Sequence, residues 1–172
     1  MRALVLFFVA IMAAAPFGAA AETGEDQMRI SSPAFENGGK IPAKYSCDGQ
    51  DASPEIAIEG VPPGAQSLVL IVDDPDAPGG TFVHWVMYNI PPSTTVIPEN
   101  GSAGTQGVNS GGEQGWNSVC PPSGSHRYFF KVYALDAVLS LYPQAADKRA
   151  VEAAMRGHVL ATAEIMATYS RP

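Results

Sequence analysis

The chain has 172 residues, of which 46% are hydrophobic, and its formal net charge is −7 at pH 7. This acidic balance disfavours nucleic acids and anionic bilayer surfaces as partners, because long-range repulsion opposes their approach. The length suits one domain that buries its own core, and the sequence has no internal repeat or low-complexity tract. Any anion that the protein binds must therefore be held by local contacts.

The first residues have the layout of a secretory signal peptide. Met1-Arg2 forms a short positive end, Ala3 to Ala15 is unbroken apolar sequence, and Ala19-Ala20-Ala21 supplies small residues for cleavage. The apolar stretch is well short of the ~20 residues that cross a bilayer, although a retained N-terminal anchor is the alternative. We predict cleavage after Ala21, a mature domain over residues 22–172, and a periplasmic or secreted location without a transmembrane segment.

Both cysteines of the chain lie beyond the predicted cleavage site. Cys47 precedes Asp48-Gly49, and Cys120 precedes Pro121-Pro122, so each stands beside turn-forming residues. In an oxidising compartment an even pair of cysteines predicts one disulfide. The alternative is a thiol nucleophile at Cys120 served by His126, which a disulfide would exclude.

Two apolar segments in the middle of the chain predict strands. Ser67 to Val72 is continuously apolar and rich in branched residues, as in a strand buried on both faces. Thr81 to Ile90 alternates, which predicts that His84 shares one face with Val86 and Tyr88. His84 is thus expected on a largely apolar face of its strand.

The second half of the chain adds a third strand and a helix. Arg127 to Asp136 alternates, and extending this strand back by one residue places His126 at the mouth of its more apolar face. Residues 100–119 lack periodicity, as binding loops often do. A helix is predicted from Gln144 to Arg156, and His158 to Tyr169 is compatible with strand or helix. The predicted class is mainly β: a sandwich of antiparallel sheets with a few short peripheral helices.

Several motifs together carry a family resemblance. They are Asp74-Pro75-Asp76-Ala77-Pro78 with His84-Trp85, Cys120-Pro121-Pro122-Ser123-Gly124, and His126-Arg127-Tyr128-Phe129-Phe130. These motifs resemble the two signature regions of the phosphatidylethanolamine-binding protein family, which includes the Raf kinase inhibitor proteins of animals and the flowering regulators of plants. Further motifs are similar to its bacterial YbhB/YbcL branch: Ser32-Pro33-Ala34-Phe35, Tyr45-Ser46-Cys47-Asp48-Gly49, Ser53-Pro54 and Gly157-His158-Val159-Leu160.

The resemblance implies a β-sandwich of two antiparallel sheets with a pocket for phosphate-like anions and phosphoethanolamine head groups. Carried over position by position, the pocket residues are Asp74, Asp76, Pro78, His84, Pro121, Pro122, His126 and Tyr128. Imidazole and phenol groups can donate hydrogen bonds to phosphate oxygens. The two carboxylates would repel a bare phosphate and are better suited to orienting the histidines or receiving the ammonium of ethanolamine. No metal or other cofactor is expected.

The chain departs from the family pattern before the second motif. Asn117 and Ser118 stand where the family branch commonly has glycines, so the pocket wall is expected to differ. Trp116 is placed to close the mouth of the pocket or to shield a different ligand. In the first motif, the Ala77–Pro78 bond is a candidate for the cis form, because tight proline turns beside ligand sites are where such bonds occur.

Three classes of function are compatible with these residues. We favour an exported binding or regulatory module that holds a small anion or phospholipid head group and inhibits a protease or another protein target. The alternatives are a hydrolase that uses Asp74, Asp76, His84 and His126 for acid/base or metal chemistry, and a structural protein in which both histidines only satisfy buried partners. No serine motif, HExxH helix or Gly-rich phosphate loop supports turnover. A homodimer is compatible with the sequence.

Overall fold

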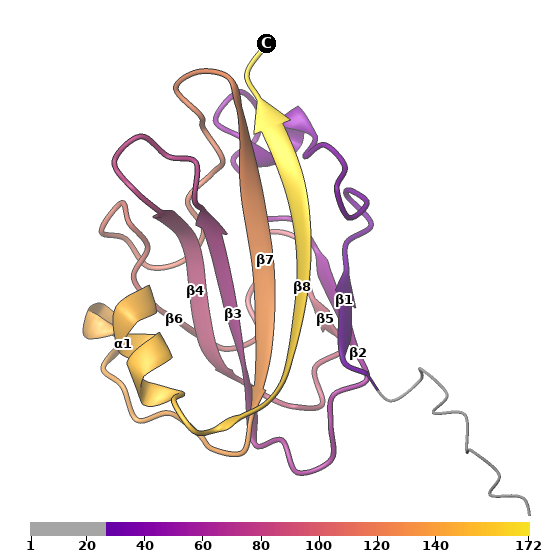
Figure 1. Cartoon of the computed structure of the whole chain (residues 1–172), viewed down its shortest axis with the longest axis vertical. Helices are drawn as coiled ribbons and strands as arrows, with labels where there is room; N and C mark the ends of the chain where they lie inside the picture. Colours follow the sequence, from indigo (N-terminus) through magenta and orange to yellow (C-terminus); the bar gives the residue numbers. More distant parts are fainter. Residues whose placement is uncertain (1–26) are drawn as a thin grey trace, which may run out of the picture.

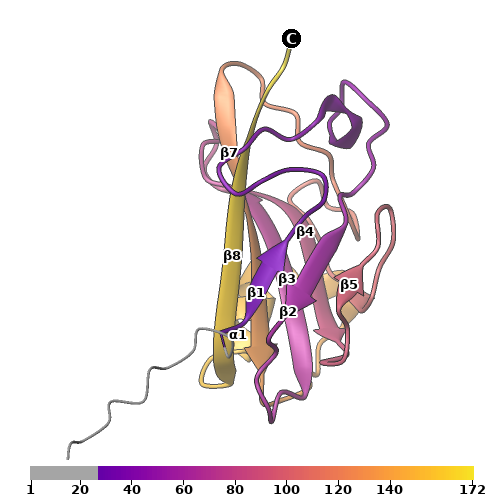
Figure 2. The same cartoon turned by 90° about the vertical axis from the view of Figure 1, so that its right-hand side faces the viewer.

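Residues 27–172, the part of the chain that the computed structural model describes, form two antiparallel sheets packed against each other (Figures 1 and 2). The signal peptide predicted over residues 1–21 lies outside the described residues. The small sheet has the order β1-β2-β5, and the large sheet has the order β6-β4-β3-β7-β8. The strands are β1 (Arg29–Ser31), β2 (Ile56–Glu59), β3 (Ser67–Asp74), β4 (Phe82–Ile90), β5 (Val96–Ile97), β6 (Thr105–Gln106), β7 (Ser125–Leu135) and β8 (Val159–Ser170).

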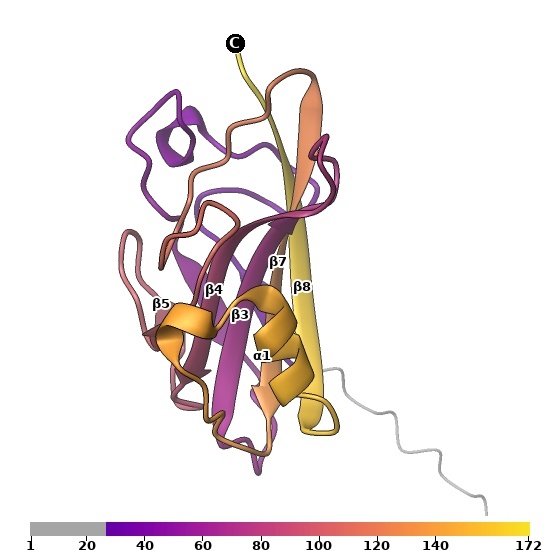
Figure 3. The same ribbon diagram turned by 90° about the vertical axis from the view of Figure 1, so that its left-hand side faces the viewer.

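Strand β3 is the centre of the large sheet and is buried along its whole length. Leu68, Leu70 and Val72 point into the main core between the two sheets, while Val69 and Ile71 point into a second core on the opposite face. Helix α1 (Lys148–Ala154) covers that second face (Figure 3). The predicted strand buried on both faces and the predicted β-sandwich are therefore confirmed.

Strand β4 contains a bulge at His84. On the neighbouring β3, Val72 pairs with Trp85, whereas the next residue, Asp73, pairs with Val83. One residue of β4 is thus left without a Cα partner at this point, which is the signature of a β-bulge. The bulge lets His84 and Trp85, although adjacent, both lie on the side of the main core.

Because of this bulge, one prediction about β4 is wrong. Val86 and Tyr88 do not share a face with His84, since both belong to the core beneath α1, whereas His84 contacts Tyr128 of the main core. The simple alternation expected along Thr81 to Ile90 is interrupted by the extra residue. The register of a strand depends on its partner as well as on its own pattern.

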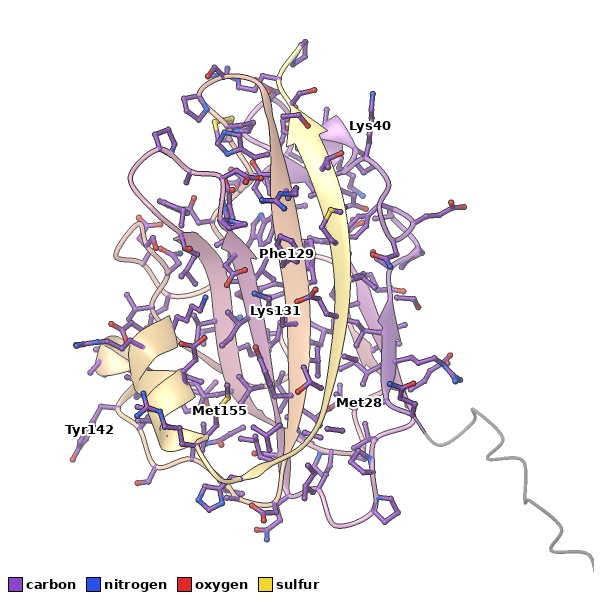
Figure 4. The ribbon with its side chains drawn as sticks, viewed as in Figure 1. Met28, Lys40, Phe129, Lys131, Tyr142 and Met155 are labelled. Atoms are coloured by element: carbon purple, nitrogen blue, oxygen red, sulfur yellow. A yellow bond between two sulfur atoms is a disulfide. The ribbon has the colours of Figure 1, made fainter. Side chains whose placement is uncertain are left out.

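The segment from His158 to Tyr169, which the sequence left open between strand and helix, is strand β8. It pairs antiparallel with β7 from Ser125↔Ser170 to Leu135↔Val159, which is the longest strand pairing within residues 27–172. Along β7 the even-numbered side chains, including Tyr128 and Phe130, are buried, as the alternation predicts. Figure 4 shows Phe129 and Lys131 on the opposite, outward face.

The predicted helix from Gln144 to Arg156 is too long. The chain forms a 3-10 turn, η2 (Pro143–Ala145), and then the α-helix from Lys148 to Ala154. Asp147 sets the start of the helix, because its side chain accepts a hydrogen bond from the backbone N–H of Ala150 at 2.7 Å. Among residues 27–172, no helix has the length and apolar content of a membrane span.

Candidate functional site

A cavity of about 410 Å³ lies at the end of the large sheet where β3 finishes and β4 and β7 begin. In Figure 1 this is the upper end of the molecule, where the loop between β3 and β4 approaches the loop that precedes β7. Six of the eight predicted ligand-binding residues line the cavity: Asp74, Pro78, His84, Pro121, Pro122 and His126. Asp76 and Tyr128 do not line it.

The loop between β3 and β4 consists of an Asx turn at Asp74 and a second turn over residues 77–80, where the chain reverses direction. The carboxylate of Asp74 accepts a hydrogen bond from the backbone N–H of Asp76 at 2.8 Å, and the N–H of Gly80 donates to the carbonyl of Ala77 at 3.0 Å. Gly80 has a φ of 102°, which reverses the chain without a cis bond. The prediction of a cis Ala77–Pro78 bond is wrong, because this bond is trans.

His126 is oriented by Asp74. Its Nδ1 lies 2.7 Å from the Oδ2 of Asp74, and the side chains are only 9% and 5% exposed. Because an ionised carboxylate accepts hydrogen bonds, Nδ1 donates, and Nε2 is left for other partners. Asp74 therefore has the orienting role that the sequence suggested for it, with both of its oxygens engaged in the structure.

His84 is held in the same manner by a backbone carbonyl. Its Nδ1 donates to the carbonyl oxygen of Asn117 at 2.8 Å, and its Nε2 is buried without a hydrogen-bond partner among the described residues. Burial lowers the pKa of His84, against the opposing effects of Asn117 and Asp74. A neutral His84 thus presents an unsatisfied acceptor at Nε2, which a ligand or a proton can satisfy.

The carboxylate of Asp76 is engaged by Arg127. Its carboxylate accepts hydrogen bonds from the guanidinium of Arg127 at 2.7 and 2.8 Å, and from the backbone N–H of the same residue at 2.9 Å. These contacts hold the pKa of Asp76 well below its usual range. Asp76 therefore fastens the turn to the start of β7, which keeps Asp74 and His126 together.

Tyr128 lies beneath the cavity rather than in its wall. Its ring meets the imidazole of His84 edge-on at 5.2 Å, and its hydroxyl is buried without a partner within residues 27–172. Burial raises the pKa of the hydroxyl, so Tyr128 keeps its proton. Its ring packs against His84, and Tyr128 is not among the residues that line the cavity.

A disulfide fixes one wall of the cavity. Cys47 and Cys120 are bonded, with Cα atoms 5.5 Å apart, and the predicted pairing is confirmed (Figure 4). The backbone N–H of Cys47 also donates to the carbonyl of Val119 at 3.2 Å. Because Cys120 is bonded, the alternative of a thiol nucleophile served by His126 is wrong.

The structure adds one polar wall residue, Ser110, that the motifs did not reveal. It lines the cavity together with Asn117 and Ser118, the two residues that depart from the family pattern. The Oγ of Ser110 accepts from the backbone N–H of Val83 at 2.8 Å, so its own proton remains available to a ligand. Serine in an aperiodic loop gives no signal in the sequence, because only the folded loop brings it to β4.

Trp116 does not close the mouth of the cavity. Its indole packs against Trp85 and Phe130 and lies 6.2 Å from the ring of His84, centroid to centroid. It is absent from the cavity lining, which instead includes Phe82, 4.8 Å from the same imidazole. Within residues 27–172, no group of three His, Cys, Asp or Glu side chains is arranged to hold a metal ion.

The fold and this site define a β-sandwich protein with a small polar cavity at one end of its larger sheet. The family described as phosphatidylethanolamine-binding protein matches residues 31–170. A UPF0098 protein of Methanothermobacter thermautotrophicus is 46% identical over 151 residues, which cover 84% of this chain and 99% of the relative. A UPF0098 protein of Aquifex aeolicus is 47% identical over 152 residues, with coverage of 84% and 89%.

Two solved structures share the architecture. CT736 from Chlamydia trachomatis, described as a homologue of the phosphatidylethanolamine-binding protein, has a TM-score of 0.83 and 43% identity, covering 86% of this chain and 99% of its own. YbcL from E. coli, described as a new member of the mammalian family, has a TM-score of 0.79 and 29% identity, covering 85% and 99%. This chain therefore belongs to the phosphatidylethanolamine-binding protein family, as its motifs predicted.

Proposed function

We propose that the protein binds a phosphate-type anion, either free or as the head group of phosphoethanolamine, in the cavity between His84 and His126. One observation carries this proposal. Both imidazoles have Nδ1 engaged by a protein acceptor, at 2.8 and 2.7 Å, so each offers only Nε2 to a ligand. Two such nitrogens in one cavity suit a ligand with several oxygens on one centre.

The remaining wall groups complement such a ligand. The hydroxyls of Ser110 and Ser118 and the amide of Asn117 are neutral donors around the histidines. A phosphate oxygen can accept from His84 once its Nε2 is protonated, and a P–OH group can donate to the same atom when His84 is neutral. Asp74 is the one carboxylate among the lining residues, and it offers an electrostatic partner for the ammonium of ethanolamine.

We further propose that the protein acts outside the cytoplasm and regulates a protein target, such as a protease, without turning over its ligand. The positive end, apolar stretch and small residues up to Ala21 support export. N-terminal sequencing of exported protein should begin at Glu22, and an intact Met1 would contradict export. Incubation with phosphoethanolamine should release no inorganic phosphate, and a sustained release rate that His126→Gln abolishes would instead indicate an enzyme.

Calorimetric titration tests the binding itself. Phosphoethanolamine and inorganic phosphate, titrated separately, distinguish the head group from the shared phosphate chemistry. His126→Gln should weaken binding about tenfold or more, because a charge-assisted hydrogen bond is lost. The matched control is His158→Gln, since His158 pairs with Asp136 at 2.8 Å on the surface and is remote from the cavity lining. Equal affinities in the two variants would contradict the proposal.

A further inference from the structure

Another pocket, of about 370 Å³, is lined in part by Trp116, whose ring lies 6.2 Å from that of His84, and it shares no lining residue with the anion cavity. Its wall consists largely of polar side chains from the segment before β2 and from the loop between β5 and β6. The side chains that matter here are Asp51, Ser53, Asn100, Ser102, Gln106 and Trp116. Its volume falls within the range of small-molecule sites.

Apart from Gln106, the polar side chains named above make no hydrogen bond within residues 27–172. The Oε1 of Gln106 accepts from the indole N–H of Trp85 at 2.8 Å, which leaves the amide nitrogen of Gln106 as a donor. Ser53 lines the pocket, and its hydroxyl takes part in none of the hydrogen bonds found within residues 27–172. Trp116 adds a buried indole N–H without a partner in the same part of the chain. Unsatisfied buried polar groups are uncommon and call for an explanation.

The backbone at this pocket is also unusual. Asp51 and Asn100 have φ values of 54° and 52°, in the left-handed region that side chains rarely adopt. The third described residue of this kind, Asn89, uses its side chain to hydrogen-bond the backbone of Leu139 twice, at 2.8 Å each. The side chains of Asp51 and Asn100 make no such contacts among residues 27–172, although both line the pocket. Strained backbone concentrates at binding sites.

The chemistry of the wall restricts the ligand. Asp51 is the one charged side chain among the lining residues, so an anion would meet repulsion and no compensating cation. A purely apolar ligand would leave the amides and hydroxyls without partners. A ring that carries many hydroxyls can donate to Asp51, exchange hydrogen bonds with Ser53, Asn100 and Ser102, and place its C–H face against the indole of Trp116. We propose that this pocket binds a neutral saccharide.

Tryptophan fluorescence gives a direct test, because the chain has two tryptophans and both line this pocket. The full chain is titrated with glucose, maltose, N-acetylglucosamine and glucosamine, and saturation-transfer NMR on the same sugars serves as a second readout. We expect saturable binding of at least one neutral sugar. Asn100→Gly, which keeps the left-handed backbone, and Ser102→Ala should each weaken it about three- to tenfold.

The matched control is Ser93→Ala, an exposed serine outside the pocket, which should bind like the unmodified chain. Absence of binding by both readouts for every neutral sugar would overturn the proposal. Binding of glucosamine alone would overturn it as well, since the pocket would then select a cation through Asp51. If both pocket variants bind the neutral sugar as tightly as the unmodified chain, the sugar binds elsewhere, and the proposal is overturned.

Discussion

The imidazole of His126 donates its Nδ1 proton to Asp74 at 2.7 Å, inside a part of the molecule where both side chains are more than nine-tenths buried. The two residues are 52 positions apart in the chain. Antiparallel pairing of β3 with β7, which sets Asp73 opposite Phe129, brings the end of one strand beside the start of the other. The pair therefore depends on sheet register, and it leaves the Nε2 of His126 for the anion that we propose.

Asp74→Asn tests this orienting role. The amide removes the charge that fixes the ring, and we expect affinity for inorganic phosphate to fall about tenfold, as for other partners that orient a ligating histidine. Calorimetry measures the effect. The control is Asp136→Asn, because Asp136 pairs in the same way with the exposed His158. An affinity unchanged in Asp74→Asn would show that the carboxylate only stabilises the fold.

The buried His84 should make stability depend on pH. Burial lowers its pKa in the folded protein below the ~6.5 of an unfolded chain, so the unfolded state binds more protons in the window between the two values. The stability contribution is thus complete above about pH 6.5 and is lost as the pH falls. Urea denaturation at pH 7, 6 and 5 should show a smaller decline in the free energy of unfolding for His84→Gln than for wild type. Parallel declines would contradict this assignment.

The imidazole of His84 should also make the affinity for phosphate depend on pH. An anion beside Nε2 favours the charged imidazole, so binding takes up a proton and affinity for phosphate should rise as the pH is lowered from 7.5 towards 6. Calorimetry in two buffers of different ionisation enthalpy measures the proton uptake. In His84→Gln the uptake should be smaller. An affinity that falls on acidification would count against a role for His84 in holding the anion.

The disulfide should support both stability and the shape of the cavity. It joins residues separated by 73 positions, for which the chain-entropy relation gives about 4 kcal/mol, and measured gains are often smaller. The double variant Cys47→Ser, Cys120→Ser should therefore be destabilised by about 2–4 kcal/mol in urea denaturation. It should also bind phosphate more weakly, because Cys120 lines the cavity. Wild-type affinity in a folded double variant would show that the wall holds its shape unaided.

A buried ion cluster attaches α1 to the large sheet. Asp73 is 2% exposed and accepts hydrogen bonds from Lys131 at 2.9 Å and from Lys148, which begins the helix. Asp73→Ala leaves Lys131 without its carboxylate partner and Lys148 with only Glu152, at 3.7 Å, and should lower the free energy of unfolding by about 3 kcal/mol. Glu59→Ala, which breaks an exposed pair with Arg29, should cost less than about 1 kcal/mol. Similar losses in the two variants would contradict a special role for Asp73.

Strand patterns predicted much of the site, because alternation decides which side chains share a face. The burial of β3 on both faces and the position of His126 at the mouth of the core followed from their own segments. The bulge at His84 was not predictable, since it arises where β4 pairs with β3. Contacts made by loops could not be predicted from the sequence either. The carbonyl of Asn117 reaches His84, and the guanidinium of Arg127 reaches the carboxylate of Asp76, only in the folded chain.

We propose that His84 and His126 bind a phosphate-type anion together. The most direct test follows the imidazole resonances of all three histidines by NMR while inorganic phosphate, and separately phosphoethanolamine, is added. We expect saturable shifts with one common affinity at His84 and His126, and none at His158, which lies on the surface beside Asp136. Equal, non-saturating shifts at all three histidines, or no shift at millimolar ligand, would contradict this proposal.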